Sequence, residues 1–137
     1  MLWPKNACLK AENEPDNCGK VINATKTWRN MTRTIYNKKK QGDYFRCTNW
    51  LMSPPNTKIE VEVLEVATPP DWFAQGCIIA GIEVKTNADQ RLTGYRFCSG
   101  DDANIKLQSE SNFVPLITYS MHTTRRLNVT LRYRYVK

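Results

Sequence analysis

Alternating hydrophobic and polar residues run along much of this chain, and such alternation predicts β-strands. The clearest example covers residues 127–135, where every second residue is hydrophobic: Leu127, Val129, Leu131, Tyr133 and Tyr135. Successive side chains of a strand point to opposite faces, so we expect one buried and one solvent-facing side. Residues 58–63 alternate in the same way, and Leu64 and Val66 then break the phase, which predicts a β-bulge or a strand buried on both sides.

Further strands are predicted between turn signals. They cover residues 44–52, 78–85, 92–98 and 113–119, and breaker segments such as the one at 53–56 separate them. Pro115 has no amide hydrogen, so we expect its strand to lie at a sheet edge or to carry a bulge. No window longer than about ten residues has a helical period. The pattern predicts an all-β fold, either an antiparallel sandwich or a jelly roll.

Length and composition bound the class of protein. The chain has 137 residues, of which 41% are hydrophobic, enough for one packed domain. No stretch approaches the ~20 apolar residues that a membrane helix needs. Residues 1–6 lack the apolar core of a signal peptide. We therefore expect no membrane insertion and, if the protein is secreted, a mature segment.

Cysteines and glycosylation sequons indicate the compartment. Five cysteines lie at positions 8, 18, 47, 77 and 98, and His122 is the single histidine, so a zinc site with four ligands in close pairs is not expected. Three sequons begin at Asn23, Asn30 and Asn128, where we expect N-glycosylation. Together with the cysteines they favour an extracellular, oxidising setting over a cytosolic chain with inert thiols.

We expect two disulfides and one remaining cysteine. Four cysteines allow three connectivities, and spacing alone does not choose between them. Their positions on predicted strands favour the local pairs Cys18–Cys47 and Cys77–Cys98, each worth roughly 3–4 kcal/mol in the chain-entropy model. Cys8 is then left over: free, capped, or bonded to a group outside this chain.

Motifs for catalysis are missing. The glycines occur singly rather than in a phosphate-binding loop, and one histidine excludes an H-E-x-x-H motif from this chain. His122 with Ser111 or Ser120 and Asp101 would make a triad, but a histidine in a loop between two strands is the favoured interpretation. Cys8 as a nucleophile has no base that the sequence indicates.

A pair of catalytic carboxylates is the remaining enzymatic option. It would come from four acidic residues: Glu60, Glu62, Glu65 and Glu83. Glu60 and Glu62 lie on the polar side of an amphipathic strand, which favours a solvated surface instead. The sequence therefore predicts no catalytic residues and no cofactor.

Positive charge is the main surface feature. Lys plus Arg number 20 against 13 for Asp plus Glu, a formal net charge of +7. Basic residues gather in a polar loop and along the final strand: Lys38, Lys39, Lys40, Arg125, Arg126, Arg132, Arg134 and Lys137. Alternate residues of a strand lie ~6.5–7 Å apart on one face, so these form a stripe suited to sulfates or acidic proteins. The alternative is a basic surface without a specific partner, and nucleic acid is not expected outside the cell.

Several segments resemble the CUB domain, an extracellular jelly roll of two sheets. Residues 18–25 with Trp28 resemble its opening strand and turn, residues 47–61 its second-cysteine segment, residues 77–84 the strand at its third cysteine, and residues 95–98 the arm that carries its fourth. The resemblance implies an all-β, CUB-type jelly-roll β-sandwich of two antiparallel sheets. Its first-with-second and third-with-fourth disulfides agree with the local pairs given above.

The similarity is more particular to the CUB-like C-terminal part of nematode astacin metalloproteases. It rests on residues 76–98, 111–119 and 131–136 and covers about residues 18–136. An EGF-like module often precedes the CUB domain in such enzymes. The resemblance therefore implies a CUB-like domain at residues 18–137. Residues 1–17 are then a linker or the end of an EGF-like module, with Cys8 as its last cysteine.

Calcium is not expected in this domain. Many CUB domains hold calcium with acidic residues and use it to bind a partner's lysine. The resemblance places one of those acids at Ala80 and another within residues 119–122, and this chain has no acidic residue at either place. Hard-oxygen coordination needs several converging carboxylates, so we predict no calcium site of this type.

Three functions remain open. The first is a non-catalytic module of a secreted nematode astacin-type zinc metalloendopeptidase, which holds substrate, matrix or the protease's own domains. The second is a free-standing secreted parasite protein that engages a host receptor, because the chain contains no protease sequence. The third is binding of a sulfated glycan by the basic residues of the loop and the final strand.

Overall fold

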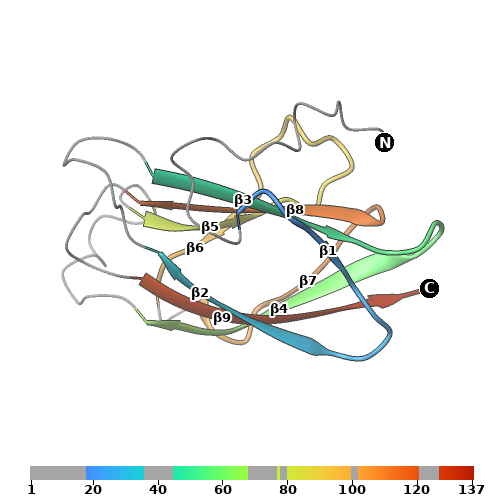
Figure 1. Ribbon diagram of the computed structural model, residues 1–137, viewed down its shortest axis with the longest axis horizontal. Helices are drawn as coiled ribbons and strands as arrows, with labels where there is room; N and C mark the ends of the chain where they lie inside the picture. Colours follow the sequence, from blue (N-terminus) through green and yellow to red (C-terminus); the bar gives the residue numbers. More distant parts are fainter. Residues whose placement is uncertain (1–17, 36–44, 68–76, 78–79, 100–101, 121–126) are drawn as a thin grey trace.

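Two stacked β-sheets make up the fold in a computed structural model, which describes residues 18–35, 45–67, 77, 80–99, 102–120 and 127–137 (Figure 1). The strands of these residues are β1 (Val21–Asn23), β2 (Arg29–Ile35), β3 (Phe45–Met52), β4 (Lys58–Ala67), β5 (Ala80–Val84), β6 (Tyr95–Phe97), β7 (Lys106–Gln108), β8 (Phe113–Ser120) and β9 (Leu127–Val136). One sheet has the order β1-β3-β8-β5-β6 and the other β2-β9-β4-β7. The predicted all-β sandwich is confirmed.

Pairing between strands is antiparallel with one exception. β1 runs parallel to β3, with Val21 opposite Trp50. The other paired strands of the described residues are antiparallel. In Figure 1 the five-stranded sheet is the upper layer, and the chain crosses from β1 down to β2 in the lower, four-stranded layer. The prediction of two antiparallel sheets therefore needs one correction, at β1.

The four-stranded sheet buries the residues that the alternation assigned to its inner side. Six of them are 6% exposed or less: Ile59, Val61 and Val63 in β4, and Val129, Leu131 and Tyr133 in β9. A register shift between Val63 and Glu65 in the pairing with β9 confirms the predicted bulge. The inward positions of β4 and β9 thus form one wall of the core.

The five-stranded sheet supplies the opposite wall. Leu51 of β3, Ile82 and Val84 of β5, and Val114 of β8 are fully buried between the sheets. Packing of two sheets face to face removes these aliphatic side chains from water, which is the main favourable contribution to folding. The two disulfides, Cys18–Cys47 and Cys77–Cys98, attach the segments before β1 and β5 to β3 and to the end of β6.

Pro115 lies in a central strand, and the prediction of an edge or bulged strand was wrong. β8 pairs with β3 on one side and β5 on the other. The nitrogen of Trp50, opposite Pro115, donates away from β8 to Lys20, so the backbone of Pro115 faces β5. Its carbonyl accepts from Lys85, one residue beyond the last β5–β8 pair at Val84. The missing amide hydrogen therefore falls where the ladder ends, and the bond it removes is the return bond to the carbonyl of Lys85.

Two strands were not predicted from the sequence. β7 has three residues, too few for a pattern. In β2 the alternation is interrupted because Arg33 lies opposite Val129 on the inner side. Arg33 donates to Oδ1 of the buried Asn49 at 3.4 Å, and burial lowers the pKa of its guanidinium. The predicted strands at 78–85 and 92–98 are longer than β5 and β6, and residues 78 and 79 lie outside the described part.

The substitution Leu51→Ala is expected to lower the free energy of unfolding by about 2–5 kcal/mol, because it leaves a cavity in the core. Leu92→Ala is a matched control, since Leu92 is 53% exposed while Leu51 is fully buried. We expect the control to change the free energy of unfolding by less than about 0.5 kcal/mol. Urea denaturation followed by tryptophan fluorescence measures both. Equal losses would contradict the position of Leu51 in the core.

Candidate binding surfaces

The outward side of the four-stranded sheet carries a charge cluster, which we call the arginine face. It consists of six residues: Trp28, Glu60, Glu62, Lys106, Arg132 and Arg134. Antiparallel register places Glu60 opposite Arg134 and Glu62 opposite Arg132. Nε of Arg134 lies 2.7 Å from Oε1 of Glu60, and Nε of Arg132 lies 2.5 Å from Oε1 of Glu62. Lys106 adds a contact of 3.6 Å to Glu60 from the neighbouring β7.

Trp28 stacks with the cations of this face. Its ring centroid lies 4.2 Å from Cζ of Arg132, 4.3 Å from Cζ of Arg134 and 5.5 Å from Nζ of Lys106. Each such cation–π contact is worth about 0.5–1 kcal/mol at an exposed site. Arg132 and Arg134 are therefore already engaged within the domain, by Trp28 and by the two glutamates.

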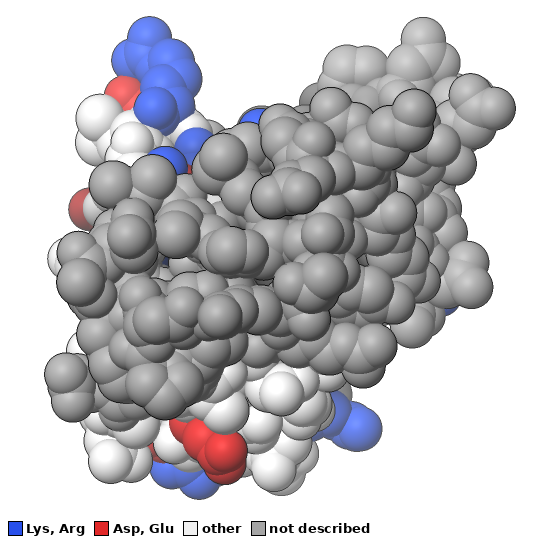
Figure 2. Space-filling view, turned by 90° about the vertical axis from the view of Figure 1, so that its left-hand side faces the viewer, with Lys and Arg blue, Asp and Glu red and all other residues white. Residues whose placement is uncertain are grey.

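These ion pairs involve two residues of the basic stripe that the sequence predicts along the final strand. Arg132 and Arg134 each have a carboxylate partner, so these two residues of the stripe are already paired within the domain. Figure 2, a view from one end of the sandwich, shows acidic and basic side chains close together on the described part of its lower side. Lys38, Lys39, Lys40, Arg125 and Arg126 lie outside the described residues. Contact of the stripe with an anionic partner stays a prediction.

Two sequons run side by side on the same sheet. Asn30 and Asn128 are both exposed, on β2 and β9, and their sequon threonines lie opposite each other with Oγ1 of Thr32 3.3 Å from Oγ1 of Thr130. Thr34 donates to Oδ1 of Asn128 at 2.7 Å, which leaves the amide nitrogen that carries a glycan outside this bond. Asn23 is exposed at the end of β1. All three asparagines are accessible to a sugar chain.

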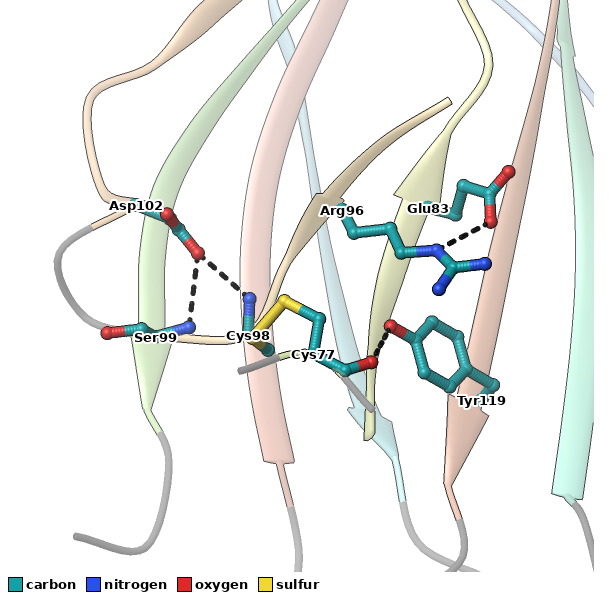
Figure 3. The surroundings of a disulfide bond; sticks show 7 residues. All are labelled: Cys77, Glu83, Arg96, Cys98, Ser99, Asp102 and Tyr119. Carbon is teal, nitrogen blue, oxygen red and sulfur yellow. Dashed lines mark hydrogen bonds and ion pairs between the residues drawn. A yellow bond between two sulfur atoms is a disulfide. The ribbon is translucent and has the colours of Figure 1, made fainter. Parts of the chain in front are cut away.

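The outward side of the five-stranded sheet has a different character. Trp50, Ile117 and Tyr119 are less than 9% exposed there, although they point away from the core between the sheets. Beside them Glu83 is also buried, and Nε of Arg96 donates to its Oε1 at 3.1 Å. Figure 3 shows the Arg96 guanidinium between this carboxylate and the ring of Tyr119, whose centroid lies 5.5 Å from Cζ of Arg96.

Two adjoining hollows open on this side, and we call them together the pocket face. One, of about 240 Å³, is lined by four charged side chains, Arg46, Glu83, Lys85 and Arg96, with Thr93, Ile117 and Tyr119. The other, of about 320 Å³, is lined by Thr48, Trp50, Pro115, Ile117 and Gln90. Arg46 and Lys85 line both hollows. The described lining thus combines an apolar part with a cationic part.

The segment between β5 and β6 builds one side of the pocket face. Gly94 donates to Oε2 of Glu83 at 2.9 Å, and a Cβ at Gly94 would lie 2.4 Å from the carbonyl oxygen of Val84, so this approach requires glycine. Lys85 donates to the carbonyl of Gln90 at 2.8 Å. Farther out, hydrogen bonds from Arg91 hold the pKa of Asp89 below its usual range.

A metal ion finds no suitable ligand set among the described residues. The Sγ atoms of Cys77 and Cys98 and a carboxylate oxygen of Asp102 lie within 4.8 Å of one another. The two sulfurs, however, are bonded to each other and are not thiolates. Asp102 accepts hydrogen bonds from the backbone of Cys98 and Ser99 (Figure 3). Ala80 is buried, and the hydroxyl of Tyr119 donates to the carbonyl of Cys77. The absence of a calcium site stays a prediction.

The structure separates the residues considered for catalysis. Asp101, His122 and Cys8 lie outside the described part of the chain. Glu83 is on the five-stranded sheet, whereas Glu60 and Glu62 are on the four-stranded one, held by arginines. Such an arrangement can bind charged groups, and within the described residues it places no nucleophile beside a base.

Sequence reasoning missed the pocket face. Arg46 is far in sequence from Lys85 and Arg96, and the three come together only because β3, β8, β5 and β6 are neighbours in one sheet. The one available signal was the shared parity of Arg46, Thr48 and Trp50 in β3. Among the described residues no helix is long and apolar enough to cross a membrane.

Replacing a glutamate of the arginine face should strengthen heparin binding. Glu62→Gln removes the partner of Arg132, so we expect this variant to elute from heparin at higher salt than the parent chain. Glu65→Gln is the matched control, because Glu65 lies on the same strand, is exposed, and changes the net charge equally. We expect a smaller shift for the control. Equal shifts would mean that Arg132 is already free to bind anions.

Comparison with known proteins gives relatives for nearly the whole domain. No protein-family model matches the chain. Zinc metalloproteinase nas-31 of Caenorhabditis elegans is 33% identical over 130 residues, which are 93% of this chain and 20% of that protein. Zinc metalloproteinase nas-25 of the same organism is 27% identical over 128 residues, 91% of this chain and 31% of that protein. The chain therefore spans about a fifth to a third of the length of these curated relatives.

Solved structures match the fold. The CUB1-EGF-CUB2 domain of human MASP-1/3 gives a TM-score of 0.57 at 14% identity, covering 84% of this chain and 42% of that one. The full extracellular region of zebrafish Gpr126/Adgrg6 gives 0.56 at 16% identity, covering 84% of this chain and 14% of that one. At such low identity the likeness shows the fold alone. The chain is therefore a CUB-like β-sandwich, related in sequence to a part of nematode astacin zinc metalloproteinases.

Proposed function

We propose that this domain is a non-catalytic, extracellular protein-binding module of a secreted nematode astacin-type zinc metalloendopeptidase. The observation that carries the proposal is 33% identity over 93% of the chain to a zinc metalloproteinase of which the chain spans only a fifth. Catalysis and zinc then belong to another part of the parent protein. The domain contributes recognition, either of substrate, of matrix or of the protease's own domains.

The chemistry of the two surfaces supports a binding role. The described residues offer charged and apolar groups on a scaffold held by two disulfides. Disulfides persist in oxidising compartments, which supports a secreted location. Residues 18–137 form the CUB-like unit in this proposal, and residues 1–17 with Cys8 are a linker or the end of an EGF-like module.

A sulfated glycan is the second candidate partner, and a free-standing parasite protein that engages a host receptor is the other alternative. The net charge of +7 favours an anionic partner in general. The ion pairs of Arg132 and Arg134 count against a glycan at that place, because a sulfate would have to displace two carboxylates. A protein partner is therefore the proposal that we carry forward.

The test uses the 137-residue chain produced with its disulfides intact. We expect no cleavage of casein with or without added zinc, and cross-linking of the chain to a defined secreted nematode protein, identified by mass spectrometry and reproduced with the purified partner. A chain reduced and alkylated at its cysteines is the control and should not cross-link. Chelator-sensitive proteolysis by the pure chain would overturn the proposal, and so would the lack of any reproducible partner.

Secretion and glycosylation provide a separate check. When the chain is made in a eukaryotic secretory host behind an added signal peptide, we expect a glycoprotein whose mass falls on treatment with peptide N-glycosidase F. Asn30→Gln and Asn128→Gln should each remove one glycan, because both asparagines are exposed. Asn87→Gln, outside any sequon, should leave the mass distribution of the glycans unchanged. Secreted chain without glycans would contradict the predicted sites.

A further inference from the structure

We propose that the pocket face binds an acidic side chain of a partner polypeptide, together with an apolar neighbour of that side chain. The proposal rests on the proposed function as a protein-binding module and names the chemistry of its partner. It concerns the outward side of the five-stranded sheet, at the two hollows lined by β3, β8, β5, β6 and the segment 85–94.

Unbalanced charge is the first observation. The described lining of the 240 Å³ hollow contains three cations, Arg46, Lys85 and Arg96, against one carboxylate, Glu83. Both oxygens of Glu83 already have partners: Oε1 accepts from Arg96 at 3.1 Å, and Oε2 accepts from the backbone of Gly94 at 2.9 Å and lies 3.9 Å from Nζ of Lys85. A single buried carboxylate cannot neutralise three cations, so the hollow attracts a further negative group.

Arg46 is the cation most available to a ligand. It is exposed, it lines both hollows, and it forms no ion pair with another described residue. The arginine face provides the contrast, because there Arg132 and Arg134 are each paired with a glutamate. An arginine fork binds a carboxylate through two parallel hydrogen bonds, which gives both energy and orientation.

An unsatisfied acceptor is the second, independent observation. Gln90 lines the apolar hollow, and its Nε2 donates to the carbonyl of Asn87 at 2.6 Å, which fixes the orientation of the amide. Its Oε1 is buried and has no hydrogen-bond partner among the described residues. A buried acceptor without a partner is costly, and a ligand N–H would remove this cost when the amide of Gln90 turns its Oε1 toward the hollow.

Apolar lining decides the class of ligand. Trp50, Pro115 and Ile117 line the 320 Å³ hollow, which shares Arg46 and Lys85 with the cationic one. A polypeptide can bring an apolar side chain, a carboxylate and a backbone N–H within two or three residues. A sulfated sugar supplies the anion but no aliphatic group of that size, so the combination favours a protein partner.

The probe is a blocked pentapeptide, glycine-leucine-glutamate-leucine-glycine, acetylated and amidated so that glutamate carries its only charge. It is added to the isotope-labelled 137-residue chain, and backbone amide shifts are followed by nuclear magnetic resonance. We expect saturable shifts at Arg46, Gln90 and Ile117. The same peptide with glutamine in place of glutamate should bind at least about fivefold more weakly, because it loses a charge-assisted hydrogen bond.

Matched variants separate the site from general charge. Arg46→Ala should weaken peptide binding at least about fivefold, and Arg46→Lys should lie between it and the parent chain. Arg29→Ala removes an exposed arginine from β2 in the other sheet and should leave the affinity unchanged. Gln90→Leu should weaken binding severalfold without moving the signals of the core. An unaltered affinity in Arg46→Ala, or equal affinity for both peptides, overturns the proposal.

Two further arms exclude other occupants. A sulfated heparin disaccharide that saturates the same amides more tightly than the glutamate peptide would make this a glycan site and overturn the proposal. The chain's own Glu12, Glu14 and Asp16 are tested by their combined change to Gln, Gln and Asn. If that variant alone shifts the signals of Arg46 and Gln90, the ligand is internal and the proposal fails.

Failure of this inference and failure of the proposed function give different results. If the chain cross-links to a secreted protein and Arg46→Ala does not weaken that complex, the pocket face is not the binding site, while the proposed binding function stands. If the peptide binds at Arg46 but no secreted partner is found, the pocket face stands and the proposed function fails.

Discussion

Every second residue of β9 faces the interior of the sandwich, and this two-residue period is the constraint on which the arginine face depends. Val129, Leu131 and Tyr133 are buried, so Arg132 and Arg134 must point outward. A register slip by one residue would place both arginines in the core, where an unpaired charge is very costly. The same register brings the glutamates of β4 opposite the arginines. Burial of aliphatic side chains therefore fixes the pairing of charges on the opposite side of the sheet.

The outward side of the other sheet follows a different rule. β8 is buried on both sides, because the outward residues Ile117 and Tyr119 are covered as well as the core residues Val114 and Leu116. Cations then gather around the single carboxylate of Glu83 instead of alternating with acidic residues. Arginine residues therefore have opposite electrostatic surroundings on the two sheets. On the four-stranded sheet, Arg132 and Arg134 form ion pairs within the domain. On the five-stranded sheet, Arg46 has no paired carboxylate among the described residues.

The CUB fold does not by itself assign a partner. The solved structures that match this fold are 11–16% identical to the chain in sequence, and a scaffold of this kind can carry unrelated binding sites. The relation to nematode metalloproteinases indicates the class of parent protein, and the surface groups indicate which chemical groups of a partner the domain can bind. The resemblance places calcium-binding acids at Ala80 and within residues 119–122; Ala80 is buried, and the hydroxyl of Tyr119 donates to the carbonyl of Cys77.

Local patterns in the sequence determined the long strands, the inner sides of β4 and β9, and the bulge after Val63, because burial on one side of a strand leaves a period of two. The local disulfide pairs also agree with the structure. Patterns could not place Pro115, because its missing hydrogen bond depends on where β5 ends. They did not predict β2, because Arg33 occupies an inward position and interrupts its hydrophobic alternation. The side chain of Arg33 donates to Asn49 in the other sheet. Only the tertiary structure decided that Arg132 is paired and that Arg46 lies with Lys85 and Arg96, because ion pairs and hollows form between strands that are distant in the chain.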